Sequence, residues 1–277
     1  MSWWCSATGQ AWEWSFRAYP GIWLCMLLLG FAYWRGWRAA RTRGELAPAD
    51  RRRAVAFTIG LSALWLATDW PIGALGAGYL ASVHMVQYQL YSLIAAPLLV
   101  WGIPEPIFAR IVTRLRIDAA MAVLTRPFVA AVVFNAVLVA THSPIAIDDL
   151  RTSQLGSFVL DALWLAAAIV LWVPVLGPRH HRIASPGAQC LYLFFALGVV
   201  PMIPGAFLTF AERPLYKVYE LAPRVGTISP EQDQQVAGLL MKVGNLPVLW
   251  LTIAVIFFRW AANERRSERQ AAGAGVP

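Results

Sequence analysis

Long runs of apolar residues, separated by short charged segments, constrain this chain more than any other feature of its sequence. A helix needs about 20 predominantly apolar residues to cross a bilayer. Because lipid offers the backbone no hydrogen-bond partner, only helices and closed barrels can span it, and a barrel would show alternating segments of about ten residues. The uniform runs seen here therefore predict an all-α, polytopic integral membrane protein.

We predict a single bundle of seven transmembrane helices within a transmembrane domain at residues 20–262. The predicted spans are 20–37, 54–70, 80–101, 127–142, 156–176, 187–210 and 235–260. Residues 1–19 contain several tryptophans, which favour the membrane interface, so they are predicted to form an interfacial N-terminal segment. Residues 263–277 are predicted to be a disordered cytoplasmic tail.

The charges of the chain are few and unevenly distributed. Only 14% of the residues are charged, against about 25% in a soluble domain. The predicted loops on one side of the membrane hold seventeen lysines and arginines, and those on the other side hold five. Since cytoplasmic loops carry the excess of positive charge, the N-terminus is predicted to lie outside and the C-terminus in the cytoplasm. The same distribution argues against a nucleic-acid partner, despite a net charge of +8.

Motifs of enzyme chemistry are missing from the sequence. It contains no phosphate-binding loop, dinucleotide fingerprint, G-x-S-x-G or H-E-x-x-H motif, and its three cysteines form neither a disulfide framework nor a C-x-x-C pair. The glycine-rich stretch 73–78 follows a membrane span rather than a strand and is predicted to be a flexible outer loop. We therefore predict that the protein is not an enzyme.

Two histidines lie within the apolar runs, and the predicted topology places both near the outer membrane face. His84 begins a polar stripe in the third predicted span, which continues through Gln87, Tyr88 and Tyr91 at helical spacing. His142 lies at the outer end of the fourth predicted span. Because placing an ionisable side chain in hydrocarbon costs free energy, such residues indicate a functional site.

Carboxylate and thioether side chains are predicted at a similar depth: Asp161, Met202, Asp233 and Met241. Imidazole combined with thioether is a ligand set that favours copper, and Cu(I) above all. A carboxylate beside a ligating histidine can fix its tautomer. We predict a copper site formed by His84, His142, Met241 and Asp233, with Asp161 and Tyr88 surrounding it.

Structural roles remain open for each of these residues. Histidine and tyrosine can serve as interfacial anchors, and methionine can serve as packing. Asp233 follows Ser229-Pro230 and could cap the N-terminus of the last helix. We also expect Lys242, which lies within the last span, to pair with Asp161 or Asp233.

Several blocks of sequence, taken in order, resemble the cytochrome c oxidase assembly factor CtaG family, a set of seven-span bacterial membrane proteins. The resemblance covers about residues 80–264. The blocks are His-Met-Val-Gln-Tyr at 84–88, the segments 96–104 and 172–177, Thr-His-Ser-Pro at 141–144, Pro-Leu-Tyr-Lys-Val-Tyr at 214–219, and the segment 233–241. The resemblance implies a multi-pass protein of the bacterial inner membrane that helps haem–copper oxidases mature. It also implies copper delivery at the periplasmic side, with terminal oxidase subunits or a periplasmic copper donor as partners.

This chain departs from the family pattern at three places. Tyr88 stands where the family's first block has a second histidine, Lys242 stands where a tryptophan often follows Met241, and Asp161 lies near a place where a histidine is common. Two other functions therefore stay open. One is a transporter for copper or another small solute, and the other is a b-type haem protein with His84 and His142 as axial ligands.

Overall fold

The computed structural model describes residues 2–274 and shows, over this range, helices and no strands. The helices are α1 (Pro20–Thr42), α2 (Asp50–Thr68), α3 (Ile72–Gly78), α4 (Ala81–Gln89), η1 (Leu90–Ala95), α5 (Ala96–Gly102), α6 (Glu105–Leu115), α7 (Asp118–Leu124), α8 (Pro127–Thr141), α9 (Pro144–Arg151), α10 (Gln154–Leu176), η2 (Arg179–His181), α11 (Pro186–Leu193), η3 (Phe194–Val199), α12 (Met202–Phe210), α13 (Lys217–Glu220), α14 (Pro230–Val243) and α15 (Leu246–Ala274). The all-α prediction is confirmed.

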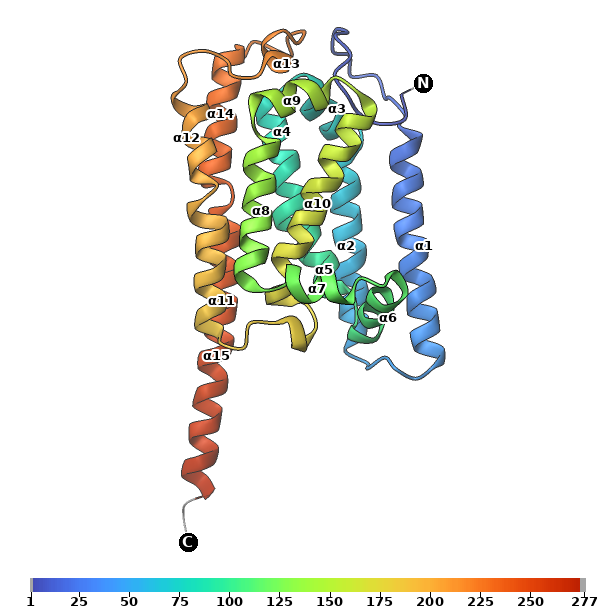
Figure 1. Cartoon of the computed structure of the whole chain (residues 1–277), viewed down its shortest axis with the longest axis vertical. Coiled ribbons are helices and arrows are strands. Elements are labelled where there is room, and N and C mark those ends of the chain that lie inside the picture. Colours follow the sequence, from blue (N-terminus) through green and yellow to red (C-terminus); the bar gives the residue numbers. More distant parts are fainter. Residues whose placement is uncertain (1, 275–277) are drawn as a thin grey trace.

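The bundle has two distinct ends (Figure 1). The short helices α3, α9 and α13 lie at one end, which we call the α13 end. The arginine-rich connection between α1 and α2 lies at the opposite end together with α6 and α7, and we call this the basic end. The long helices run between the two ends, and α15 extends beyond the basic end.

Four helical segments are long and apolar enough to cross a membrane: Ala81–Gly102, Gln154–Leu176, Pro186–Phe210 and Pro230–Gln270. The number rises to six if two bent pairs each count as one span, α2 with α3 at 46° and α7 with α8 at 85°. The structure therefore supports four to six spans rather than clearly seven. The helix α1 has 23 residues, but its tryptophans and arginines lower its hydropathy, and it is not among the candidates.

Three predicted spans, 80–101, 156–176 and 187–210, match observed segments to within two residues at each end. The last predicted span is longer in the structure, because α14 and α15 together form the segment Pro230–Gln270. Residues 263–274, predicted to be part of a disordered tail, are helical in α15. They are rich in alanine, arginine, glutamate and glutamine, which all favour helix, and residues 275–277 lie outside the described range.

A proline explains the interruption of the helix in the sixth predicted span. Pro201 lacks an N–H and so leaves the Leu197 carbonyl at the end of η3 without a helical donor, and the Asn245 side chain donates to that carbonyl. The helix is interrupted at residues 200–201 before α12 begins. Pro201 therefore accounts for this interruption of the sixth predicted span.

The glycine-rich stretch 73–78 is not a flexible loop, so that prediction is wrong. It forms α3, in which every residue from Gly73 to Gly78 is buried. A Cβ atom at Gly76 would lie 2.9 Å from Gln87 Oε1 and 3.1 Å from the His84 backbone nitrogen. Small residues here allow α3 to pack directly on α4, as they do between membrane helices.

The N-terminal segment is partly buried. Trp14 and Phe16 are 67% and 63% exposed, as an interfacial segment requires, whereas Trp4 and Cys5 are 4% and 1% exposed. Trp4 packs edge-on against Phe158 of α10, with ring centres 5.0 Å apart. This segment therefore closes one side of the bundle at the α13 end as well as supplying surface aromatics.

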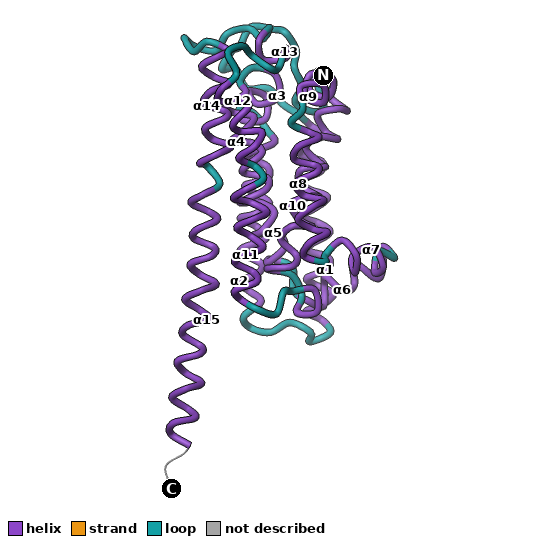
Figure 2. The backbone as a smooth tube through the Cα atoms, turned by 60° about the vertical axis from the view of Figure 1, so that its left-hand side comes forward, coloured by secondary structure: helices purple, strands orange, loops and turns teal. Residues whose placement is uncertain are grey.

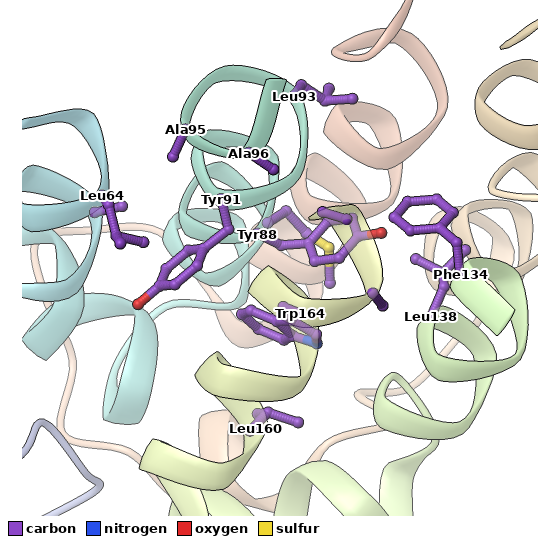
Figure 3. Packing of buried hydrophobic residues seen from close by; sticks show 14 of the residues in the cluster. Leu64, Tyr88, Tyr91, Leu93, Ala95, Ala96, Phe134, Leu138, Leu160 and Trp164 are labelled. Carbon is purple, nitrogen blue, oxygen red and sulfur yellow. The ribbon is translucent and has the colours of Figure 1, made fainter. Parts of the chain in front are cut away.

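The core is formed mainly by large side chains of α2, α4, η1, α8 and α10. Trp164 of α10 lies beside Tyr88 and Tyr91, while Tyr88 points toward Phe134 (Figure 3). On the outside of the bundle, side chains such as Leu27 of α1 and Phe258 of α15 are 71% and 64% exposed. Figure 2 shows α15 standing at the edge of the bundle, where such side chains would face lipid.

Candidate functional site

His84 and His142 lie together at the α13 end of the bundle. Residue 84 is on α4, and residue 142 directly follows α8. Their side chains are 0% and 4% exposed, and their ring centres lie 5.6 Å apart at an interplanar angle of 75°. The structure thus brings together the two intramembrane histidines that the sequence predicted to share a site.

Hydrogen bonds determine which ring nitrogen of each histidine carries the proton. His142 Nδ1 lies 2.8 Å from the Leu138 carbonyl, which can only accept, so Nδ1 carries the hydrogen. His84 Nδ1 lies 2.8 Å from the Tyr219 hydroxyl, whose own hydrogen is directed at the Gly76 carbonyl 2.7 Å away. His84 Nδ1 is therefore the donor to Tyr219. Both neutral rings consequently present a lone pair at Nε2.

Both Nε2 atoms are buried and have no hydrogen-bond partner among residues 2–274, and the same is true of the Tyr88 hydroxyl. The Tyr88 ring lies edge-on to His142, with ring centres 4.8 Å apart. Buried polar atoms are almost always satisfied, and exceptions indicate an ordered water, an ion or a ligand. Three unsatisfied groups in one aromatic cluster make this place the candidate binding site.

Trp164 of α10 holds the cluster in place. Its ring centre lies 4.9 Å from that of His84 and 5.5 Å from that of His142, against which it stacks. Its indole N–H donates to Thr141 Oγ1 at 3.0 Å, which connects α10 to the end of α8. This single side chain thus contacts both histidine rings, although the sequence pattern does not single it out.

A buried ion pair borders the site. Arg151, which lies between the predicted spans 127–142 and 156–176, is 0% exposed, and its Nη2 lies 3.1 Å from Asp161 Oδ1. The guanidinium also lies over Trp164, 5.1 Å from the ring centre, and donates to Gln87 Oε1 at 3.2 Å. The Trp4 indole donates to Asp161 Oδ2 at 2.9 Å. Asp161 therefore neutralises the arginine next to the histidines.

Asp233 contacts the beginning of α4. Its Oδ2 accepts from the Ala81 backbone N–H at 2.6 Å, and its Oδ1 accepts from the Ser82 backbone N–H at 3.2 Å and from the Ser82 hydroxyl. A carboxylate at this position satisfies free N–H groups and complements the helix dipole. Its own helix, α14, is capped by Ser229 in a capping box with Gln232. Asp233 thus caps the N-terminus of α4 and not that of its own helix, α14.

Lys242 does not pair with either carboxylate among the described residues, so the predicted ion pair is wrong. Its Nζ lies over the Phe210 ring, 4.7 Å from the ring centre. Asp161 is engaged by Arg151, and Asp233 is engaged by the first turn of α4. The lysine instead takes an aromatic partner on the neighbouring helix α12.

The two candidate methionines lie in different surroundings. Met241 is 3% exposed and lines a cavity of about 20 Å³ together with Met85 and Tyr88. Met202 is 45% exposed on the outside of α12 and so does not face the bundle interior. Within residues 2–274, no cluster of three or more His, Cys, Asp or Glu side chains has the geometry of a metal site.

Two tyrosines of the segment 213–232 cover the histidines. Tyr216 and Tyr219 are 3% and 5% exposed, and the Tyr216 hydroxyl donates to the His142 carbonyl at 2.8 Å. Burial raises the pKa of Tyr219 above its ordinary value, so its hydroxyl stays protonated and can serve His84 and Gly76. The sequence of the block 214–219 does not reveal its contact with His84, because this contact spans 135 positions.

The fold and the site together define a polytopic helical membrane protein with a pair of imidazoles buried at one end of its bundle. The family model for the cytochrome c oxidase caa3 assembly factor (Caa3_CtaG) matches residues 31–263, and the chain belongs to that family. The resemblance seen in the sequence is thus confirmed. No curated protein and no solved structure matches the chain.

Proposed function

We propose that this assembly factor takes up a copper ion at the Nε2 atoms of His84 and His142 and passes it on to cytochrome c oxidase at the periplasmic side of the membrane. Membership of the family connects the chain with assembly of the oxidase. The protonation of the two imidazole rings supports copper binding. Both Nδ1 atoms donate hydrogen bonds, while both Nε2 atoms have no hydrogen-bond partner among the described residues. A ligating histidine almost always donates its second ring N–H to a carbonyl or another acceptor in this way.

The spacing of the rings fits a shared ion. A metal–nitrogen bond to imidazole is about 2 Å long, so two imidazoles that bind one ion hold their ring centres about 5 to 6 Å apart. The observed separation is 5.6 Å. Imidazole nitrogens suit copper, and the thioether of Met241, which shares a cavity with Tyr88, adds a donor type that favours Cu(I).

The surroundings of the pair favour a cation of low charge. Arg151 would oppose a metal ion, but Asp161 neutralises it at 3.1 Å. Asp233 is left out of the proposed ligand set, because its oxygens already accept hydrogen bonds from Ala81 and Ser82. The proposed donors are therefore neutral, which suits Cu(I) better than a divalent ion that must be compensated in a low-dielectric site.

The α13 end is the proposed meeting place with the partner. Tyr216 and Tyr219 face inward, so a partner would contact the exposed side chains beside them on α13. Leu221 is 81% exposed, and Lys217 and Glu220 are also exposed. A partner that moves this segment would break the bond between Tyr219 and His84 and open the site.

A b-type haem is not proposed. Trp164 packs 4.9 Å from His84 and 5.5 Å from His142. This ring occupies space beside the pair that a macrocycle between two axial imidazoles would need. A transporter for copper or another small solute is not proposed either. Large apolar side chains such as Leu93, Phe134 and Trp172 fill the core of the bundle, where a transported solute would need polar groups.

Copper loading of the purified protein tests the proposal. We expect the full-length chain to retain about one Cu(I) per molecule after loading and desalting, and the His84→Ala/His142→Ala variant to retain none. In cells, the same variant should lower the copper content of the oxidase while leaving its own amount in the membrane unchanged. The measurements are metal analysis of both proteins and immunoblotting of the membranes.

The matched control is His180→Ala, which removes a histidine that is exposed at the basic end. This variant should load copper as the unaltered protein does. Equal copper retention by the double variant, or normal copper in the oxidase of cells that carry it, would disprove the ligand assignment.

A further inference from the structure

A cavity of about 590 Å³ lies between α5, α10, α11 and α15, far from the histidine pair. Of these helices, α15 packs most closely against α11. The cavity walls include Trp101 of α5, Trp172 of α10 and Trp260 of α15. Figure 2 shows α15 at the edge of the bundle.

The lining of this cavity changes from charged to apolar along its length. Arg53, Arg182 and Arg259 line it at the basic end, where α2 begins and α15 leaves the bundle. Toward the bundle centre it is lined by Leu93 of η1 and Val248 of α15. The cavity is therefore amphipathic along the membrane normal, with its cationic end at the basic end of the bundle.

The positive charge of this rim is only partly compensated by the protein. Arg53 Nε lies 3.3 Å from Asp50 Oδ1, but neither Arg182 nor Arg259 forms an ion pair within residues 2–274. Burial, together with the nearby guanidinium groups of Arg53 and Arg179, lowers the pKa of Arg182. An anion bound at this rim would relieve that repulsion.

The length of the cavity is comparable to the thickness of one membrane leaflet. Along α15 the cavity extends from Val248 to Asn263, a distance of about 22 Å at about 1.5 Å rise per residue. One leaflet of the hydrocarbon core is about 15 Å thick, half of the roughly 30 Å total. The cavity is thus long enough for a headgroup and an acyl chain.

We propose that this cavity binds an anionic phospholipid of the leaflet at the basic end, with its phosphate between Arg182 and Arg259 and an acyl chain along Leu93 and Val248. Basic pockets between transmembrane helices on the cytoplasmic side recognise such headgroups. Bidentate hydrogen bonding by guanidinium groups suits a phosphate oxygen pair. The bound lipid would fill the space between α15 and the rest of the bundle.

Native mass spectrometry of the full-length protein in detergent tests this proposal. The probes are phosphatidylglycerol, phosphatidylethanolamine and inorganic phosphate, each titrated separately. We expect phosphatidylglycerol to bind at one site and phosphatidylethanolamine to bind much more weakly. Arg182→Gln/Arg259→Gln should weaken phosphatidylglycerol binding about thirtyfold, which corresponds to about 2 kcal/mol.

Two further variants distinguish lipid binding in the cavity from general electrostatic attraction between the lipid and the arginines of α15. Arg265→Gln/Arg266→Gln removes the same charge from α15 beyond the cavity and should change binding less than threefold. Thr252→Trp keeps every charge but narrows the cavity and should also weaken binding. Equal losses in the two arginine double variants, or equal binding of the two lipids, would overturn the proposal. Competition by inorganic phosphate at the lipid's own concentration would do the same, since it would reveal a site for soluble anions.

Discussion

Two histidine rings reach the same tautomer through different kinds of contact. The His142 Nδ1–H donates to the carbonyl of Leu138, four residues earlier at the end of the same helix. The His84 Nδ1–H donates to Tyr219, which comes from α13. The state of His142 is therefore determined locally, whereas that of His84 depends on a segment far away in the sequence. A histidine's ligating nitrogen is set by the bond that its other nitrogen makes.

Replacing Tyr219 should therefore weaken the proposed copper site without removing a ligand. In Tyr219→Phe the Nδ1–H of His84 loses its acceptor, and Nδ1 and Nε2 then compete for the proton. Loss of such a supporting partner lowers metal affinity by about 10- to 100-fold. The measurement is Cu(I) affinity of the purified variant, by competition with a chromophoric chelator.

Tyr192→Phe is the matched control for this prediction. Its hydroxyl donates to the Leu171 carbonyl at 2.7 Å, so the substitution also removes one hydrogen bond, worth about 1 kcal/mol of stability. Its copper affinity should be unchanged. If the two variants bound copper equally well, Tyr219 would have no role in positioning His84.

At the scale of elements, small residues determine how closely the helices of the α13 end can pack. Gly238 of α14 faces Gly205 and Thr209 of α12, and a Cβ atom at 238 would lie 2.5 Å from Thr209 Oγ1 and 2.6 Å from its backbone nitrogen. Close backbone approach through small residues is a principal means of association between membrane helices. The position of α14, and with it that of Asp233 and Met241, therefore depends on this contact.

Gly238→Ala should destabilise the protein, because the new methyl group meets backbone atoms that cannot turn away. Overpacking of this kind costs about 1–3 kcal/mol. Gly30→Ala is the control, since a Cβ atom there meets only Leu61 Cδ2 at 3.4 Å. The second substitution should stabilise α1 by about 0.5–1 kcal/mol, because glycine in a helix interior is unfavourable. Unfolding in detergent measures the free energy of unfolding of each variant. If both substitutions changed it in the same direction, close packing at Gly238 would not be the cause.

At the scale of the whole molecule, the two ends of the bundle differ in charge and in chemistry. The basic end carries the arginine-rich connections and the proposed lipid cavity, whereas the α13 end carries the histidine pair. The excess of arginine at one end predicts that this end faces the cytoplasm. The proposed copper site then opens to the periplasm, the side on which the proposed transfer takes place.

Cysteine labelling in intact cells tests this orientation. In a background with Cys5, Cys25 and Cys190 replaced by alanine, Glu220→Cys should react with a membrane-impermeant maleimide. Arg114→Cys, which is exposed at the basic end, should react only after the cells are permeabilised. The reverse pattern would place the histidine pair on the cytoplasmic side and exclude periplasmic transfer.

The sequence was sufficient for the features that depend on local composition. The apolar runs predicted the segments Ala81–Gly102, Gln154–Leu176 and Pro186–Phe210, because solvation of the backbone in lipid leaves no alternative to a long helix. The cost of burying an imidazole in hydrocarbon also marked His84 and His142 correctly as partners in one place. Composition alone did not predict the structure of the stretch 73–78. Its glycines are compatible with a flexible loop and equally with the buried helix α3 that the structure shows.

The tertiary structure decided which atoms are free and which are already engaged. Asp233 is chemically suited to a metal, yet the unsatisfied N–H groups at the start of α4 hold both of its oxygens. Arg151 looks like a loop charge, yet Asp161 and the face of Trp164 make its burial possible. The sequence determines which groups a chain can offer, but the partner of such a group can lie as far as 152 residues away, as Asp233 does from Ala81, and only packing brings the two together.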